Sequence, residues 1–219
     1  MPLYFDPNYL ALAINGKQPP ETIKVELTRR EIGILKLMTG ELVACDPFWI
    51  RYGAVPFTQK LAKGNYPVTI TIARFESRTD ERVTFASFRL SDADIVAWEM
   101  MLLPEQDISQ LGDKHFYGYG VDAGTGCFLD KKVARFLYEN ENRDTIQDKL
   151  METLRSNYKF TRNWGEIAVE DGNIIAFSSG WGDGAYPTFA AFDEDNNVVA
   201  VVTDFMCFYG EYHESNTAS

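Results

Sequence analysis

The sequence predicts a mainly β member of the α+β class: an antiparallel β-sandwich or barrel-like core with two helices inserted around residues 131–158. Segments on both sides of this insert alternate apolar and polar residues, as half-buried strands do. Apolar residues make up 45% of the chain and aromatic residues 14%, which suits a β-rich core. Strands, then helices, then strands again favour antiparallel sheets with the helices packed at one side.

The N-terminal part, residues 21–128, is predicted to form strands. Its candidate strands are residues 23–27, 32–37, 42–45, 68–75, 83–90 and 95–103. The second and third are predicted to form a hairpin across Thr39 and Gly40, and the fourth and fifth another hairpin. The last segment fits both a strand and a helix, and its period of two favours a strand.

The helical insert covers residues 130–158, and a break near residues 140–144 predicts two helices. Asp130 stands at the N-cap position of the first helix, and the spacing of Thr145 and Asp148 resembles a capping box for the second. C-terminal strands are predicted within residues 164–208, in the segments 166–169, 174–177, 186–192 and 198–205. Residues 211–219 are expected to be a frayed polar tail.

The chain of 219 residues is predicted to be a single domain. Its 21 basic and 32 acidic side chains give a formal charge of -11, which repels nucleic acid and anionic lipid. Neither is expected as a partner, whereas opposite charge would steer a basic protein toward the chain. No secretion signal or membrane span is visible, so we expect a cytoplasmic protein.

The cysteines are Cys45, Cys127 and Cys207, an odd number of residues far apart in the sequence. With only His115 and His213 to assist them, they do not predict a thiolate zinc site. We expect three buried thiols in a reducing compartment.

A first candidate site is Val-Asp-Ala-Gly-Thr-Gly at residues 121–126. It resembles the phosphate-binding hairpin of the actin and sugar-kinase superfamily, but too little chain follows for that fold and its second phosphate loop. The alternative is a tight turn in which Asp122 accepts hydrogen bonds from nearby amides.

A second candidate is Gly-Trp-Gly-Asp-Gly-Ala-Tyr-Pro at residues 180–187. Its glycines would let backbone amides approach a ligand, Asp183 supplies an acceptor, and two aromatic rings supply apolar walls. The alternative is a wide connection whose Asp183 satisfies the amides of the loop itself. Together the two segments predict a ligand-binding site made of Asp122, Gly124, Thr125, Trp181, Asp183 and Tyr186.

Residues 64–67 (Gly-Asn-Tyr-Pro) and 184–187 (Gly-Ala-Tyr-Pro) both lead into a strand, a polar turn and another strand. This repetition predicts two related hairpins that face each other across the core, unless the four-residue match is a coincidence.

The combination of five segments in this chain is specific: residues 44–47 (ACDP), 64–68 (GNYPV), 119–130 (YGVDAGTGCFLD), 177–187 (FSSGWGDGAYP) and 202–205 (VTDF). They resemble a mostly bacterial family catalogued as a domain of unknown function, number 4241. The resemblance spans about residues 30–208 and implies one domain with a shared site region, but no reaction. After Pro187 this chain continues Thr-Phe-Ala-Ala-Phe, which is more apolar than the pattern.

The leading functional hypothesis is a non-enzymatic binding protein with a loop-built recognition site for a protein or small ligand. By analogy, a partner-neutralising role like that of bacterial immunity proteins would suit an acidic surface. The alternative is a hydrolase in which Asp122, Asp183 and Asp204, with Asp46, hold Mg²⁺ or Ca²⁺ and activate water. Apart from such a cation no cofactor is expected, and no Gly-x-Ser-x-Gly nucleophile motif is present.

Overall fold

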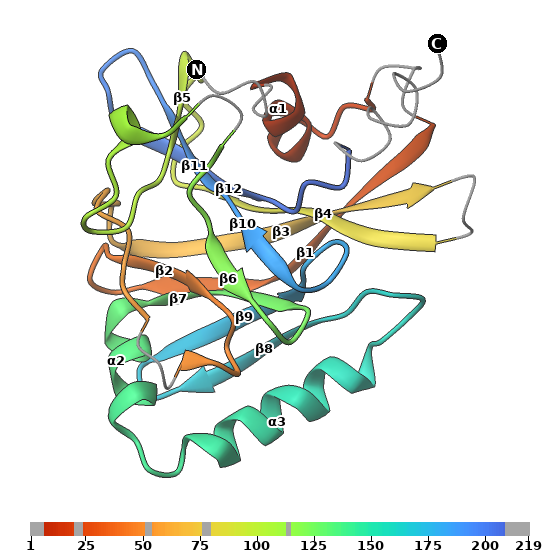
Figure 1. The fold of residues 1–219 in the computed structure, drawn as a ribbon, viewed down its shortest axis with the longest axis vertical. Helices are drawn as coiled ribbons and strands as arrows, with labels where there is room; N and C mark the ends of the chain where they lie inside the picture. The colour runs from red at the N-terminus through yellow and green to blue at the C-terminus, as the bar shows by residue number, and fades with distance from the viewer. Residues whose placement is uncertain (1–6, 20–23, 51–53, 76–79, 113–114, 209–219) are drawn as a thin grey trace.

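The computed structural model of the chain describes residues 7–19, 24–50, 54–75, 80–112 and 115–208 (Figure 1). Its helices are α1 (Pro7–Asn15), the 3-10 helix η2 (Ile108–Gln110), α2 (Lys131–Glu139) and α3 (Arg143–Ser156). Its strands are β1 (Val25–Leu37), β2 (Leu42–Cys45), β3 (Gly64–Phe75), β4 (Asp80–Arg89), β5 (Ala97–Met100), β6 (Tyr119–Val121), β7 (Thr125–Asp130), β8 (Trp164–Val169), β9 (Gly172–Ser178), β10 (Gly184–Tyr186), β11 (Thr188–Phe192) and β12 (Val198–Asp204).

The strands form two main antiparallel sheets and a small ribbon. The larger sheet has the order β1-β3-β4-β12-β11-β5, the smaller sheet the order β2-β7-β9-β8, and β10 pairs with β6. The smaller sheet packs against the larger one beneath β1, α1 lies on β4 and β12, and α2 and α3 cover the other face of the smaller sheet (Figure 1). The predicted fold class is confirmed as a sandwich, since the sheets do not close into a barrel in the described residues.

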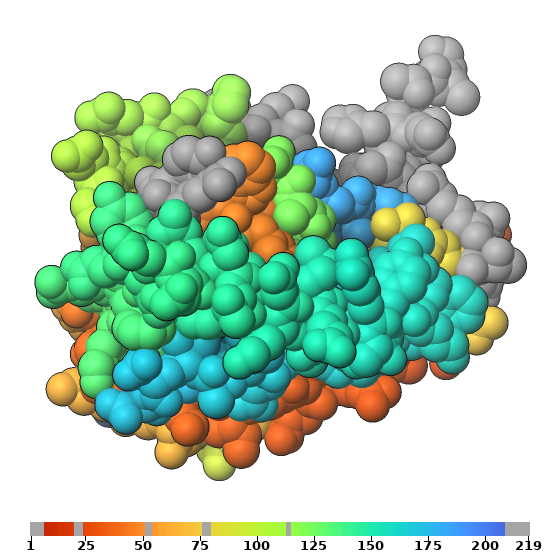
Figure 2. Space-filling model, turned by 90° about the horizontal axis from the view of Figure 1, so that it is seen from below, coloured from red at the N-terminus to blue at the C-terminus, as the bar shows by residue number. Residues whose placement is uncertain are grey.

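The central strands of the smaller sheet, β7 and β9, are buried on both faces, which explains their apolar runs. Phe128 and Phe177 face the larger sheet, and their rings meet edge to face at 5.0 Å. Their chain neighbours Leu129 and Ala176 belong to a second apolar cluster under α2 and α3. Figure 2 shows α2 and α3 lying across this side of the molecule. Strands between two apolar layers lose the alternation of a half-buried sheet.

The helical insert confirms part of the sequence analysis. Two helices separated near residue 140 are present, and the Asp130 carboxylate caps α2 by accepting the Lys132 N–H at 2.8 Å. The capping box is wrong: α3 begins at Arg143, two residues before Thr145, and its N-cap residue Asn142 makes no side-chain capping bond. The sequence analysis also missed α1, although the sequence has a helix-start signal there, with Asp6 directly before Pro7, the first helical residue of PNYLALAIN.

The hairpin expected across Thr39 and Gly40 is also wrong. β1 pairs with β3, and β2 pairs with β7 in the other sheet. The Asp130 carboxylate holds this corner by accepting the N–H and the hydroxyl of Thr39 at 2.7 and 2.8 Å. Gly40 has φ +77, a conformation that suits both a hairpin turn and a turn that carries the chain to another sheet. Which of the two forms depends on the sheet against which each flanking strand packs.

The hairpins that follow the two Gly-x-Tyr-Pro motifs do not face each other across the core. They are β3–β4 and β11–β12, and they lie side by side in the larger sheet because β4 pairs with β12. The motifs nevertheless share a local structure. The Tyr66 hydroxyl donates to the Ala62 carbonyl at 2.9 Å, and the Tyr186 hydroxyl donates to the Gly182 carbonyl at 2.8 Å, each four residues back in the chain.

The strands predicted separately at residues 23–27 and 32–37 are wrong as two elements, because they belong to one strand, β1 (Val25–Leu37). The remaining predicted strands, including the hairpin of residues 68–75 and 83–90, are present with shifted ends. The predicted polar tail lies outside the described residues. Within the described residues, no helix has the length and apolarity needed to cross a membrane. The division into a single domain stays a prediction.

Candidate functional site

The two glycine-rich loops of the sequence analysis lie side by side. β6 and β10 pair in register from Val121 opposite Gly184 to Tyr119 opposite Tyr186 (Figure 1). Beyond this ribbon, the Gly124 N–H donates to the Asp183 carboxylate at 3.0 Å. The structure thus brings together the turn that carries Asp122 and the turn that carries Asp183.

The Asp46 side chain holds the first turn, the one that carries Asp122, through hydrogen bonds to its backbone. Its buried carboxylate accepts the backbone N–H groups of Phe48 at 2.9 Å, Asp122 at 2.9 Å and Ala123 at 2.7 Å. These amides are therefore occupied and do not cradle a phosphate as the kinase-like hairpin would. The expectation that Asp122 accepts from nearby amides is replaced by an arrangement in which Asp46 is the acceptor.

Burial raises the pKa of the Asp46 carboxyl above its ordinary value, and the nearby Asp122 carboxylate adds to the rise. The three amide donors act in the opposite direction because they stabilise the anion.

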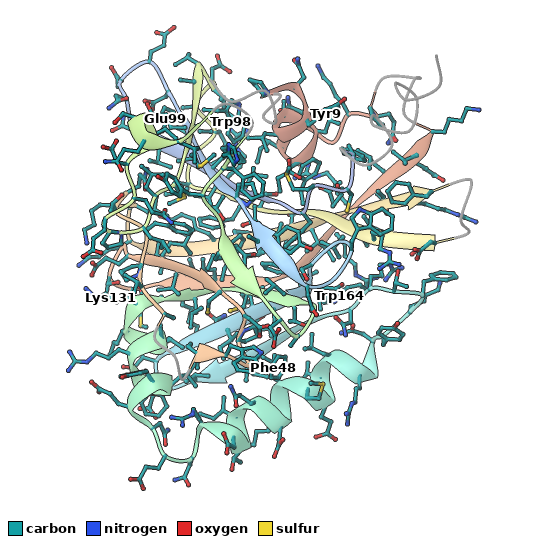
Figure 3. The ribbon with its side chains drawn as sticks, in the orientation of Figure 1. Tyr9, Phe48, Trp98, Glu99, Lys131 and Trp164 are labelled. Carbon is teal, nitrogen blue, oxygen red and sulfur yellow. The ribbon has the colours of Figure 1, made fainter. Side chains whose placement is uncertain are left out.

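The segment around Asp46 is also tied to α3, since the Gln147 side chain donates to the Pro47 carbonyl at 2.9 Å. Figure 3 shows Phe48 beside α3.

The second turn depends on Gly180 and Tyr186. Gly180 has φ +52, and a Cβ atom there would lie 2.9 Å from the Phe205 carbonyl oxygen. The Tyr186 hydroxyl donates to the carbonyls of Ser179 at 3.1 Å and Gly182 at 2.8 Å. Burial, with smaller contributions from Cys207 and Asp183, raises the pKa of Tyr186 to about 12. Tyr186 is thus buried beneath the loop and does not form an exposed wall.

Thr125 is also buried, and its hydroxyl donates to the Ala123 carbonyl at 3.3 Å. Of the six predicted ligand-binding residues, Thr125 and Tyr186 therefore support the loops from inside. Asp122, Trp181 and Asp183 are exposed, with Gly124 joining the two turns.

Trp181 is the apolar feature of the second turn. Its side chain is 39% exposed, yet it is held on two sides. The Arg82 guanidinium lies 4.8 Å from the centre of its ring, and the Phe75 ring lies 5.4 Å away. Arg82 also donates to the Gly180 carbonyl at 3.2 Å, so one arginine fixes both the backbone of the turn and its aromatic ring.

Asp204 lies at the end of β12 and is buried, unlike Asp122 and Asp183. One of its oxygens accepts the Met206 N–H at 2.7 Å. Among the described residues, no group of three or more His, Cys, Asp or Glu side chains is arranged to hold a metal ion. The metal site of Asp122, Asp183 and Asp204 therefore stays a prediction that the arrangement of these carboxylates does not favour.

The sequence analysis missed a contact between two cysteines. Cys45 and Cys127 are partners in the register of β2 and β7, and their sulfur atoms are 3.7 Å apart. All three cysteines are free; Cys127 and Cys207 are buried as expected, whereas Cys45 is half-buried. No spacing signal could have shown the pair, because β2 and β7 meet only through the pairing of the smaller sheet.

A family model described as "Protein of unknown function (DUF4241)" matches residues 35–203. The comparison with curated proteins and the comparison with solved structures each found no match. The matched region begins within β1, ends within β12 and includes both turns of the candidate site. The chain therefore belongs to the DUF4241 family of proteins of unknown function.

Proposed function

We propose that this protein is a non-enzymatic binding protein that recognises a partner protein through Asp122, Trp181 and Asp183. We call these three residues the paired-loop surface. The observation that carries the proposal is an exposed tryptophan and two exposed carboxylates on two turns that are hydrogen-bonded to each other.

The two turns are held in place before any partner arrives. Asp46 fixes the first turn, while Tyr186 and Arg82 fix the second. A loop that is already ordered loses less conformational entropy when it binds. An aromatic ring fixed at a surface is also a common anchor of protein interfaces.

Charge indicates the kind of partner. The whole chain has a formal charge of -11, and two carboxylates lie in the paired-loop surface. A partner with a basic surface would be steered to it, and binding would weaken as salt rises. We therefore propose a basic protein as the partner, which is compatible with a partner-neutralising role.

The test begins with capture of partners from an extract of the source organism by the immobilised chain. A captured protein is then purified, and its Kd is measured for the wild type, Trp181→Ala and the double variant Asp122→Asn with Asp183→Asn. The asparagine at 183 keeps an oxygen for the Gly124 N–H, so the double variant removes charge with little change in shape. We expect both variants to weaken binding at least about tenfold.

Tyr138→Ala is the matched control, because Tyr138 is 53% exposed but lies on α2. It should leave the Kd unchanged. Equal affinities for the wild type and both site variants, or no capture that depends on these residues, would contradict the proposal.

The hydrolase hypothesis is separated from binding by thermal melting with Mg²⁺, Ca²⁺ or Mn²⁺. A cation at a hundred times its dissociation constant stabilises the fold by about 2.7 kcal/mol. Such a rise in the wild type, absent from the double variant, would favour a metal site.

A further inference from the structure

The contact between Cys45 and Cys127 has the arrangement of an open dithiol pair. Their residues are directly opposite each other on antiparallel strands, and the two sulfur atoms are 3.7 Å apart. Directly paired residues have Cα atoms about 4.5 to 5.5 Å apart, within the usual range for a disulfide. The sulfur atoms need only approach further, to about 2.05 Å, for a bond to form.

The two thiols differ in their surroundings. Cys127 is fully buried in the apolar cluster under α2 and α3, whereas Cys45 is half-buried at the end of β2. Burial and the hydrogen bond to Cys45 raise the pKa of the Cys127 thiol well above its ordinary value. An oxidant arriving from solvent therefore meets Cys45 first, while Cys127 stays protonated behind it.

We propose that Cys45 and Cys127 are a modification site at which a peroxide oxidises Cys45 and Cys127 then closes an intramolecular disulfide. The Cys45 sulfur attacks one oxygen of the peroxide and the O–O bond breaks, so that Cys45 sulfenic acid forms and hydrogen peroxide leaves as water or an organic peroxide as its alcohol. The Cys127 sulfur then attacks the Cys45 sulfur, so that the S–S bond forms and the S–O bond breaks. The departing hydroxide takes the proton of Cys127 and leaves as water. A small dithiol reverses the reaction and is itself oxidised to a disulfide.

A disulfide between Cys45 and Cys127 would affect the nearby turn that carries Asp122. Cys45 directly precedes Asp46, whose carboxylate holds the N–H groups of Asp122 and Ala123. A covalent link between β2 and β7 restrains the backbone of Asp46, which directly follows β2. We therefore expect the turn that carries Asp122 to open less often in the oxidised chain.

The first experiment treats the wild-type chain with hydrogen peroxide and counts its thiols after denaturation, followed by peptide mapping. The three thiols of the reduced chain should fall to one, and a single peptide pair should link Cys45 to Cys127. Reduction with dithiothreitol should restore three. Cys207→Ala should behave like the wild type, because Cys207 lies apart in the other apolar cluster, whereas Cys45→Ser should form no intramolecular disulfide.

The mapping on the wild type decides the chemistry even where a variant folds poorly. A Cys45 that stays as sulfenic or sulfinic acid, three unreacted thiols, or a bond to Cys207 would overturn the proposal. In a second experiment the chain is treated with oxidised glutathione, and the Cys127 thiol should displace glutathione from Cys45 to form the same disulfide. A glutathione adduct that persists on Cys45 would show that Cys127 does not react with it and would overturn the proposal. Hydrogen exchange at the amides of Asp122 and Ala123 should be slower after oxidation, and unchanged or faster exchange would overturn the restraint on the turn.

Discussion

Asp46 joins two distant parts of the chain through one carboxylate. It accepts from Phe48 in its own segment and from Asp122 and Ala123 in the turn after β6. A buried carboxylate usually costs desolvation energy, and amide donors are the common way to offset that cost. The sequence marked Asp46 as a candidate metal ligand, since a carboxylate beside a strand end looks the same whether it meets a cation or a row of N–H groups.

Tyr186 gives a prediction about pH at the same scale. Its folded-state pKa is raised to about 12, above the ordinary value of 10.0, so the folded protein holds this proton more tightly than the unfolded chain does. The stability it contributes is complete below pH 10 and is lost as pH rises from 10 to about 12. The loss is limited to about 3 kcal/mol, because each pKa unit corresponds to roughly 1.4 kcal/mol.

The measurement is urea unfolding of the wild type and Tyr186→Phe across this pH range. Because the other tyrosines titrate in both proteins, only the difference in unfolding free energy between them reports on Tyr186. That difference should be constant below pH 10 and shrink above it. A difference that stays constant through pH 12 would show that the folded protein holds this proton no more tightly than the unfolded chain does.

The edge strands of the larger sheet show how side-chain amides act on whole elements. β1 and β5 are the two edges. On β1, the Gln18 side chain accepts from the Leu27 N–H at 2.8 Å and donates to the Leu27 carbonyl at 3.0 Å. Farther along β1, the Asn173 side chain accepts from the Lys36 N–H at 3.0 Å and donates to the Ile34 carbonyl at 2.7 Å. A carboxamide thus stands in for the peptide group of a neighbouring strand.

At the end of β5, the Gln59 side chain accepts from the Leu102 N–H at 3.2 Å and donates to the Met100 carbonyl at 3.3 Å. Both edges of the larger sheet therefore carry such caps. Open edges pair with other chains, and proteins commonly block them.

We expect Gln18→Ala to increase self-association, because it leaves the Leu27 N–H and carbonyl open to a strand of another molecule. Sedimentation velocity over a range of protein concentrations measures the effect. Lys17→Ala is the control, since it removes a neighbouring side chain and leaves the cap in place. Two variants that stay equally monomeric would show that this cap does not limit edge pairing.

Element types were largely predictable from the sequence, and element partners were not. Strong alternation in residues 68–75 and 83–90 predicted β3 and β4, and the period of the helical insert predicted α2 and α3. The break at residues 38–41 was read as a hairpin, although it carries the chain from one sheet to the other. Local sequence encodes the conformation of a segment, whereas its partner depends on which apolar faces meet.

At the scale of the whole molecule, the smaller sheet links two apolar layers. Along β7, Phe128 packs toward the larger sheet while Cys127 and Leu129 pack toward the helices. Neither layer can lose its packing without exposing one face of this sheet. The two layers should therefore unfold together, as expected of one domain.

This prediction is tested with Phe128→Ala, which weakens the first layer, and Leu150→Ala, which weakens the second. Removing the phenylalanine should cost about 3 to 5 kcal/mol and removing the leucine about 2 to 5 kcal/mol. In both variants tryptophan fluorescence and far-UV circular dichroism should report one shared transition. Separate transitions in Leu150→Ala would indicate that the helical layer unfolds by itself.

The sequence alone determined the fold class, the presence and order of most strands, the two inserted helices, and the two turns most suited to a site. These features follow from local periodicity, charge and glycine content, which act over a few residues. The tertiary structure alone decided that β1 and β2 belong to different sheets, that Asp46 occupies the amides of the first turn, that Tyr186 lies beneath the second, and that Cys45 meets Cys127. Each depends on contacts between distant segments, and such contacts are set by the burial of apolar faces rather than by any pattern within one segment.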